Sequence, residues 1–273
     1  MPIVTQTNVA SLETQKNLFR SQAALQKSFS RLSSGHRINS AADDAAGLAI
    51  SESMRTQIRS YVVAERNASD AISMTQTAEG ALGEMHSILG RLRELAMQGS
   101  NGSMTATDRG YLSTEFSALQ AEMTRIQASS KFNGKSLLSA TASSLTFQVG
   151  LNNTASDKVT LTFGGLGRTT LLAATTNLSG AGTTASLTAL GRIDSALATI
   201  STSRARFGAA MNRFEVVTSS IQTMRLNLSA ANSRIRDVDV AEETSALARN
   251  QVLSQAGVAV LAQANQLPQL ALS

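Results

Sequence analysis

The sequence predicts a mainly α-helical protein: a long antiparallel, coiled-coil-like helical rod with a small β-hairpin region and paired N- and C-terminal helices. Three observations predict this fold. Apolar residues recur at steps of three and four over very long stretches. Hydrophobic residues make up 42% of the 273 residues but aromatic residues only 4%, which favours narrow, repetitive packing over a bulky core. One middle stretch changes to the two-residue alternation that is typical of β-strands.

The first forty residues carry one apolar stripe that is typical of a helix. Leu18, Leu25 and Leu32 recur every seven residues, and Phe29 follows Leu25 by four. The polar sequence SSGH at 33–36 then breaks the pattern. The sequence therefore predicts an N-terminal helix that ends near this break.

The second helix is expected to be very long. Ser40 and Asp43 have the spacing of a capping box and mark its predicted start. Apolar residues then follow over Ile50–Ala96, which at 1.5 Å per residue corresponds to about 70 Å. That length and a spacing near 3.5 residues indicate a coiled-coil-like seam. Two glycines within 98–108 end the helix. A third helix is predicted after them, with these residues on one face: Leu112, Phe116, Leu119, Met123 and Ile126.

The middle of the chain follows a different pattern. Residues 145–149 and 159–163 alternate apolar and polar side chains around GLNNTASDK, which predicts a β-hairpin. The residues Phe-Asn-Gly at 132–134 carry a turn signal. Residues 164–186 are rich in Gly, Ser, Thr and Ala and predict a loop or a small exposed lobe. The hairpin and loop region is thus placed at about 136–186.

Two further helices are expected in the last part of the chain. Apolar residues recur from Ser186 to Ile235, and this helix can pack antiparallel to the second one. Asp239 and Glu242 have capping-box spacing and open a fifth helix. Among the last thirty residues only Arg249 is charged, yet Gln, Asn and Ser recur too often for a membrane span.

The apolar residues of this last helix fall on more than one face. A helix with several apolar faces and almost no charge requires neighbours on several sides. The N-terminal helix supplies one neighbour, and copies of the same chain are expected to supply the others. Head-to-tail contacts that do not close into a ring produce a helical filament. Both ends are expected to be poorly ordered in an isolated monomer. The predicted self-assembly residues are Leu18, Leu25, Phe29, Leu32, Leu247, Leu253, Val258, Val260, Leu261 and Leu267.

Residues for catalysis or metal binding do not converge in the sequence. The chain has no Cys, which excludes disulfides, thiol catalysis and cysteine ligation of zinc. His36 and His86 lie far apart in sequence, and the acids at 43–44 and 237–243 are interpreted as helix-start acids. The sequence also lacks a phosphate-binding loop and a Gly-flanked Ser. We therefore expect no enzyme, no cofactor and no metal.

Charge and hydropathy exclude two further classes of partner. The net charge is +5, but the basic residues are scattered, so nucleic-acid binding is not expected as the main role. No segment is long and apolar enough to insert into a membrane. The opening MPIVTQTNVASLETQ has neither a basic start nor an apolar run, so a cleaved secretory signal is not expected.

Four motifs closely resemble bacterial flagellin. They are SFSRLSSGHRINSAADDAAGLAISESMRTQIR, GRLRELAMQGSNG, KFNGKSLL and SRIRDVDVAEETSALARNQVLSQAGVAVLAQANQLPQ. The resemblance covers about residues 1–140 and 185–273. It implies an assembly domain of paired terminal helices with a connecting spoke (D0; 1–42 and 236–273) and a rod domain (D1; 43–235). It also implies a minimal flagellin without large outer domains.

The resemblance implies a structural subunit that polymerises into the extracellular flagellar filament for swimming motility. It implies export through the flagellar type III apparatus without a cleaved signal. The implied partners are other copies of the chain, an export chaperone that docks on residues 240–270, and the filament cap and hook–filament junction proteins. The alternatives are a hook–filament junction protein and a secreted coiled-coil adaptor.

One receptor site is implied by the same resemblance. Flagellins are detected by an animal Toll-like receptor, and Arg91, Leu95 and Glu115 match the central positions of that patch. The alternative interpretation of these residues is packing within the rod and contact between subunits.

Overall fold

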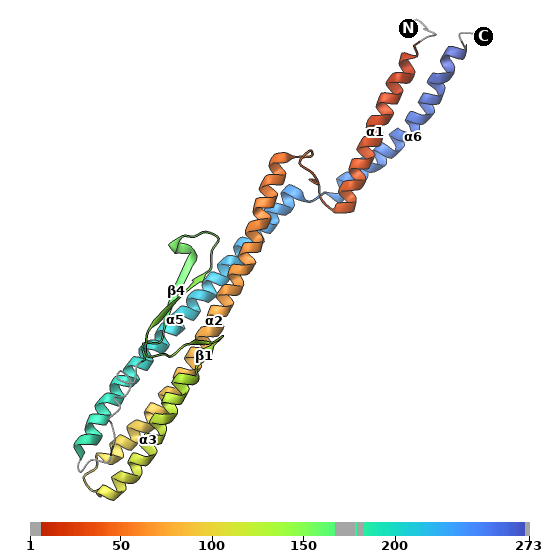
Figure 1. The fold of residues 1–273 in the computed structure, drawn as a ribbon. Helices are drawn as coiled ribbons and strands as arrows, with labels where there is room; N and C mark the ends of the chain where they lie inside the picture. Colours follow the sequence, from red (N-terminus) through yellow and green to blue (C-terminus); the bar gives the residue numbers. More distant parts are fainter. Residues whose placement is uncertain (1–6, 167–177, 179–182, 271–273) are drawn as a thin grey trace. The chain divides into compact units, whose positions relative to one another are not determined.

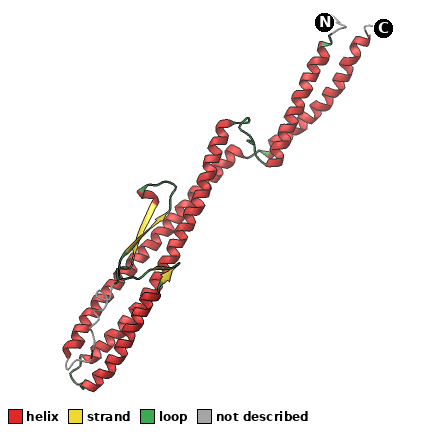
Figure 2. Cartoon of the chain, viewed as in Figure 1, coloured by secondary structure: helices red, strands yellow, loops and turns green. Residues whose placement is uncertain are grey.

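The computed structural model divides the chain into two compact units. Unit 1 comprises Met1–Ile58 and Leu226–Ser273, and unit 2 comprises Arg59–Arg225. Helices α2 (Ala45–Gly99) and α5 (Thr183–Arg236) contribute residues to both units. The structure describes residues 7–166, 178 and 183–270, and side chains as far as 266. Helices dominate the described part of the chain (Figure 2), which confirms the predicted mainly α fold.

Unit 1 contains a pair of terminal helices, α1 (Val9–Ser34) and α6 (Val240–Leu270), side by side (Figure 1). Their pairing is antiparallel. The Asn8 side chain donates to the Ala264 carbonyl over 2.7 Å at one end, and Arg31 forms an ion pair with Glu243 at the other. The predicted pairing of the two terminal helices is therefore confirmed.

The ends of α1 follow ordinary capping chemistry. The Asn8 side chain accepts a hydrogen bond from the Ser11 N–H, which satisfies a free donor of the first turn. The helix ends at Gly35, whose φ of 72° is a left-handed conformation that glycine adopts without steric cost. The predicted break at SSGH thus has a specific cause in Gly35.

The start of α2 corrects one expectation. The helix begins at Ala45, and Asp44 caps it by accepting the Gly47 N–H over 2.8 Å. Asp43 accepts from the Ser40 N–H, as in half of the predicted capping box, but this contact lies in the turn before the helix and does not cap it. Ser40 and Asp43 met the spacing rule, but their contact belongs to the preceding turn, so Asp44 is the residue that caps the helix.

Unit 2 is built around α2, α3 (Ala106–Ser129) and α5. Within unit 2 the ion pairs Glu79–Arg204 and Arg93–Asp194 join α2 to α5 in antiparallel register, each with a closest contact of 2.7 Å. The predicted seam of α2 is confirmed from Ala64 onward. Its fully buried residues include Ala68, Ala71, Ala78, Leu82, Met85, Leu89 and Leu92, which pack in one core with Ile193, Ala196, Ile200 and Phe214 of α5.

Two polar features explain details of this unit. Thr75 interrupts the apolar seam but is fully buried, because its hydroxyl donates to the Ala71 carbonyl over 2.7 Å. Helix α3 starts with a capping box between Thr105 and Asp108, which also lowers the pKa of Asp108. The predicted face of α3 is confirmed, with Phe116 and Met123 buried.

Two hairpins complete unit 2. Strands β1 (Lys131–Phe132) and β2 (Lys135–Ser136) flank a turn in which Asn133 and Gly134 both have positive φ. Strands β3 (Ser143–Gln148) and β4 (Lys158–Phe163) form the predicted hairpin, with the short 3-10 helix η1 (Ala155–Asp157) before β4. The rings of Phe147 and Phe163 pack against Phe214 and Phe207 of α5. Most of the predicted loop at 164–186 lies outside the described residues.

Candidate assembly surface

The seam between α1 and α6 contains both large and small side chains. On α1, Leu18, Leu25 and Leu32 are partly buried, and Ser11, one heptad before Leu18, and Ser28, between Leu25 and Leu32, are buried. The Ser11 hydroxyl donates to the Asn265 side chain over 2.7 Å. A seam with few large side chains allows close approach of the helices but buries little apolar surface.

Large apolar side chains remain exposed on both helices of this pair. Leu12 and Phe19 lie about two turns apart and therefore share one face of α1, away from the leucine seam. Phe19 is 70% exposed and Val252 on α6 is 64% exposed. The exposed apolar residues of the pair are Val9, Leu12, Phe19, Phe29, Val240, Val252, Leu253, Val258 and Val260. Exposed apolar residues at this density are typical of a surface that is covered in an assembly.

The predicted self-assembly residues occupy two different environments. Leu18, Leu25, Leu32, Leu247 and Leu261 are partly buried, and Phe29, Leu253, Val258 and Val260 are exposed. The side chain of Leu267 lies outside the described residues. Residue spacing did not single out Val9, Leu12, Phe19 and Val252, although Leu12 and Phe19 repeat at the same seven-residue interval as the leucines. The assembly role of all these residues stays a prediction.

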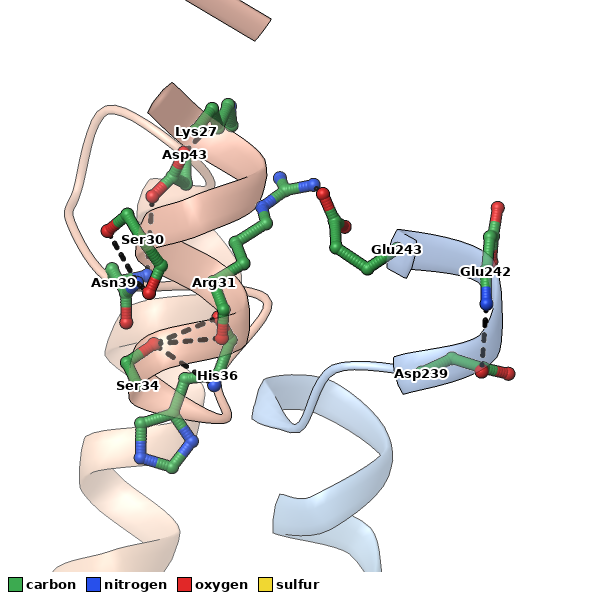
Figure 3. A network of polar contacts seen from close by, with 10 residues as sticks. All are labelled: Lys27, Ser30, Arg31, Ser34, His36, Asn39, Asp43, Asp239, Glu242 and Glu243. Atoms are coloured by element: carbon green, nitrogen blue, oxygen red, sulfur yellow. Dashed lines mark hydrogen bonds and ion pairs between the residues drawn. The ribbon is translucent and has the colours of Figure 1, made fainter. Parts of the chain in front are cut away.

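The segment between α1 and α2 is tied down by polar contacts (Figure 3). Lys27 Nζ lies 2.7 Å from Asp43 Oδ1, and the Asn39 side chain donates to the Ser30 carbonyl over 3.2 Å. The hydrogen bond from Lys27, followed by those from the Asn39 and Ser40 backbone N–H groups, lowers the pKa of Asp43 to about 2.

The same segment pairs with the chain between α5 and α6. The Arg37 N–H donates to the Arg236 carbonyl over 2.6 Å, and the Val238 N–H donates to the Gly35 carbonyl over 3.1 Å. At the start of α6, Asp239 accepts from the backbone N–H group of Ala241 and also from that of Glu242, the second of which Figure 3 shows. The predicted capping role of Asp239 is therefore confirmed.

A polar cavity of about 510 Å³ lies beside these contacts within unit 1. Its charged lining residues are Lys27, Arg31, Arg37, Arg234, Asp237, Asp239, Glu242 and Glu243. Positive and negative side chains are interspersed, which favours neither an anion nor a cation. Across the described ranges, no three His, Cys, Asp or Glu side chains are grouped closely enough to hold a metal. Among the helices described, none combines the length and hydropathy needed to span a bilayer.

The three residues matched to the receptor patch lie at the contact of α2 with α3 in unit 2. Arg91 Nε donates to Glu115 Oε1 over 2.8 Å, and Arg91 also forms an ion pair with Glu94. These contacts, with Glu94 the largest, raise the pKa of Arg91. Leu95 is fully buried, so it is part of the core of unit 2 and is not exposed on this surface. The receptor role of the three residues stays a prediction.

Comparison with known proteins agrees with this arrangement. The bacterial flagellin N-terminal helical region matches residues 5–143, and the bacterial flagellin C-terminal helical region matches residues 190–273. A flagellin of Halalkalibacterium halodurans is 43% identical, with 97% of each chain covered, and a flagellin of Bacillus subtilis is 42% identical, with 96% of each covered.

Two solved structures are also similar. The crystal structure of Bacillus cereus flagellin has 31% identity and a TM-score of 0.50, covering 61% of this chain and 94% of that one. A putative flagellar hook-associated protein from Vibrio parahaemolyticus has a TM-score of 0.61, covering 71% of this chain and 100% of that one, but its 14% identity shows a shared fold alone. The two terminal matches and the end-to-end relatives establish that the chain belongs to the bacterial flagellin family, in a minimal form.

Proposed function

We propose that this chain is the structural subunit that polymerises into a flagellar filament outside the cell and serves swimming motility. The observation that carries the proposal is the row of exposed apolar side chains on both helices of the terminal pair, such as Phe19 and Val252. The pair has only one seam, so further chains are needed to cover these faces. Burial of apolar area, at about 25 cal/mol per Å², then drives association.

A filament requires each copy to offer more than one contact surface to its neighbours. Head-to-tail contacts use two different surfaces of each copy, and they build an open filament when the rotation between copies does not close into a ring. Exposed apolar residues lie on both α1 and α6, so one copy presents more than one surface to its neighbours. A filament built this way transmits torque mechanically and needs no catalytic group. We propose that the D0 and D1 domains meet between residues 42 and 43 and between residues 235 and 236.

The exposed apolar residues of α6 are also the proposed contact site for partners during export. Before polymerisation α6 exposes Val252, Leu253, Val258 and Val260 to water. We propose that residues 240–270 dock on a cytosolic export chaperone that covers them. The chain then passes through the flagellar type III apparatus without a cleaved signal. The cap and the hook–filament junction proteins are the proposed partners at the two ends of the filament.

A Toll-like receptor is the proposed host partner of unit 2. Arg91 and Glu115 are both exposed and joined at 2.8 Å, so a receptor that binds there has to compete with this ion pair. Leu95 contributes through the position of α2.

A hook–filament junction protein is the main rival. The shared fold with a hook-associated protein is compatible with it, but the terminal matches and end-to-end relatives are flagellins. Long homopolymers distinguish the subunit from a junction protein, which forms a thin zone, and from a coiled-coil adaptor, which forms a small oligomer.

The experiment compares seeded polymerisation of the full chain with that of two variants. Short filament seeds are added to purified protein, and growth is followed by electron microscopy and sedimentation. The double variant Leu12→Gln/Phe19→Gln is expected to lose most growth, because Gln keeps helix propensity but removes apolar surface. Val216→Gln, on a unit 2 residue that is also 70% exposed, serves as the matched control. Equal growth by the double variant and the unchanged chain would exclude the proposed surface.

A further inference from the structure

We infer that Asn101 is a site of spontaneous covalent modification, at which its side-chain amide becomes a carboxylate through a cyclic imide formed with Gly102. Asn101 and Gly102 are exposed in the connection between α2 and α3, outside helix and strand. The inference is independent of polymerisation, because it concerns the reactivity of one turn within unit 2.

The local geometry brings the reacting groups together. The Asn101 side-chain oxygen accepts a hydrogen bond from the Ser103 N–H over 3.2 Å. This contact folds the Asn101 side chain back over the Gly102 peptide unit, toward the nitrogen that would attack it. A Cβ at Gly102 would meet no residue other than its chain neighbours within 4 Å, so no other part of the chain crowds this glycine.

The chemistry needs only water. The Gly102 backbone nitrogen attacks the Asn101 side-chain carbonyl carbon, a C–N bond forms, and the side-chain nitrogen leaves as ammonia with the proton from the glycine nitrogen. Water then opens the five-membered imide at either carbonyl. One opening yields aspartate, and the other yields isoaspartate, in which the backbone runs through the former side chain. Both products add a negative charge.

The isoaspartate product is expected to disturb the hydrogen bonds of the buried Arg109 side chain. The Asn101 backbone carbonyl accepts from Arg109 Nη2 over 3.1 Å, and Arg109 Nε donates to the Gly99 carbonyl over 3.0 Å. Arg109 is only 7% exposed, so these two carbonyls satisfy a largely desolvated guanidinium. An extra backbone carbon at residue 101 displaces one of the two acceptors, which loosens the connection between α2 and α3.

A second Asn-Gly pair in unit 2 provides an internal comparison. Asn133 and Gly134 form the turn between β1 and β2, with φ values of 46° and 80°. Phe132 and Lys135 pair directly across this turn, which fixes the backbone on both sides. Imide formation at Asn133 requires the turn to open, whereas Asn101 has no strand pairing to break. Asn101 is therefore expected to react first.

The test incubates the full chain under warm, mildly alkaline conditions and maps both sites by peptide mass spectrometry. An isoaspartyl methyltransferase with labelled methyl donor detects the isoaspartate fraction. Conversion at Asn101 is expected to exceed that at Asn133 severalfold in the folded chain. In urea the two rates should converge, because both sequences then lack structure.

The variant Gly102→Ala is expected to slow the reaction without changing the fold. Gly102 has no positive φ and open surroundings, so alanine fits the backbone while its methyl group hinders ring closure. We expect this variant to lose most conversion at Asn101 and to keep conversion at Asn133. Hydrogen exchange of residues 99–109 should rise with isoaspartate content in the unchanged chain. Equal conversion of the two asparagines in the folded chain, or unchanged conversion at Asn101 in Gly102→Ala, would overturn the inference.

Discussion

Lys27 and Asp43 form an ion pair of 2.7 Å that fastens the segment before α2 to the side of α1. The pair joins residues sixteen positions apart, across the connection where α1 has already ended at Gly35. Asp43 also accepts the Asn39 and Ser40 N–H groups, so its carboxylate organises the whole turn. Its charge is therefore needed for the conformation of this connection.

Acid is expected to loosen this connection, and Asp43→Asn is expected to remove part of that sensitivity. The pKa of Asp43 falls from 3.8 to about 2 in the folded chain, mainly through Lys27. Because the folded value lies below the unfolded one, the carboxylate stabilises the fold fully above the unfolded pKa. This contribution declines below that value and is lost as pH falls through the folded pKa. Hydrogen exchange of residues 35–44, measured as pH is lowered across this window, reports the loss.

Lys27→Met is the companion variant for this measurement. It removes the largest cause of the lowered pKa but keeps the aliphatic part of the side chain. We expect its exchange to rise at higher pH than in the unchanged chain. If Asp43→Asn and the unchanged chain showed the same pH profile, Asp43 would not control the connection.

Local patterns predicted the parts of the fold that local chemistry determines. The seam from Ala64 to Ala96 and the hairpin of β3 with β4 follow directly from periodicity, because side-chain spacing decides which face can be buried. The turn at Asn133 was visible for a similar reason, since Asn-Gly favours positive φ at both positions.

The sequence did not predict features that depend on competition or on tertiary packing. Asp43 and Asp44 both fit a helix start, and only the contacts of the preceding turn separate their roles. The resemblance matched Leu95 to a receptor surface, but the side chain is fully buried, because its burial depends on packing within unit 2. Phe19 was not among the predicted assembly residues. Whether a helix residue is exposed depends on how many neighbouring helices cover that helix, and periodicity does not give that number.

Gly47→Ala is expected to destabilise the start of α2. A Cβ at this position would overlap Asp44 Oδ2 and would lie 2.8 Å from Ile38 Cδ1. Ile38 is buried, and Asp44 is held as the helix cap, so neither can move without losing a contact. The cost is expected to be about 1–3 kcal/mol of unfolding free energy, as for other overpacked sites.

Gly80→Ala is the matched control for that measurement. Gly80 also lies inside α2, but a Cβ there meets nothing within 4 Å. Alanine has the higher helix propensity, so this variant should gain up to about 1 kcal/mol. Urea unfolding followed by circular dichroism measures both changes. Two changes of the same sign would show that crowding at Gly47 does not decide the outcome.

Gly257→Ile is expected to separate the terminal helices. A Cβ at Gly257 would lie 3.4 Å from Leu18 Cδ1. Gly257 is therefore a point of close contact between α6 and the Leu18 side chain of α1. A branched side chain there pushes Leu18 out of the seam and removes apolar burial on both helices. In the assembled protein the variant should show faster hydrogen exchange in α1 and α6 with unchanged exchange in the core of unit 2. Ala256→Ile, at an exposed neighbouring position on the same helix, adds comparable bulk outside the seam and should leave exchange in α1 nearly unchanged. Equal protection of α1 in Gly257→Ile and in the unchanged chain would mean that the seam does not depend on the Leu18 contact.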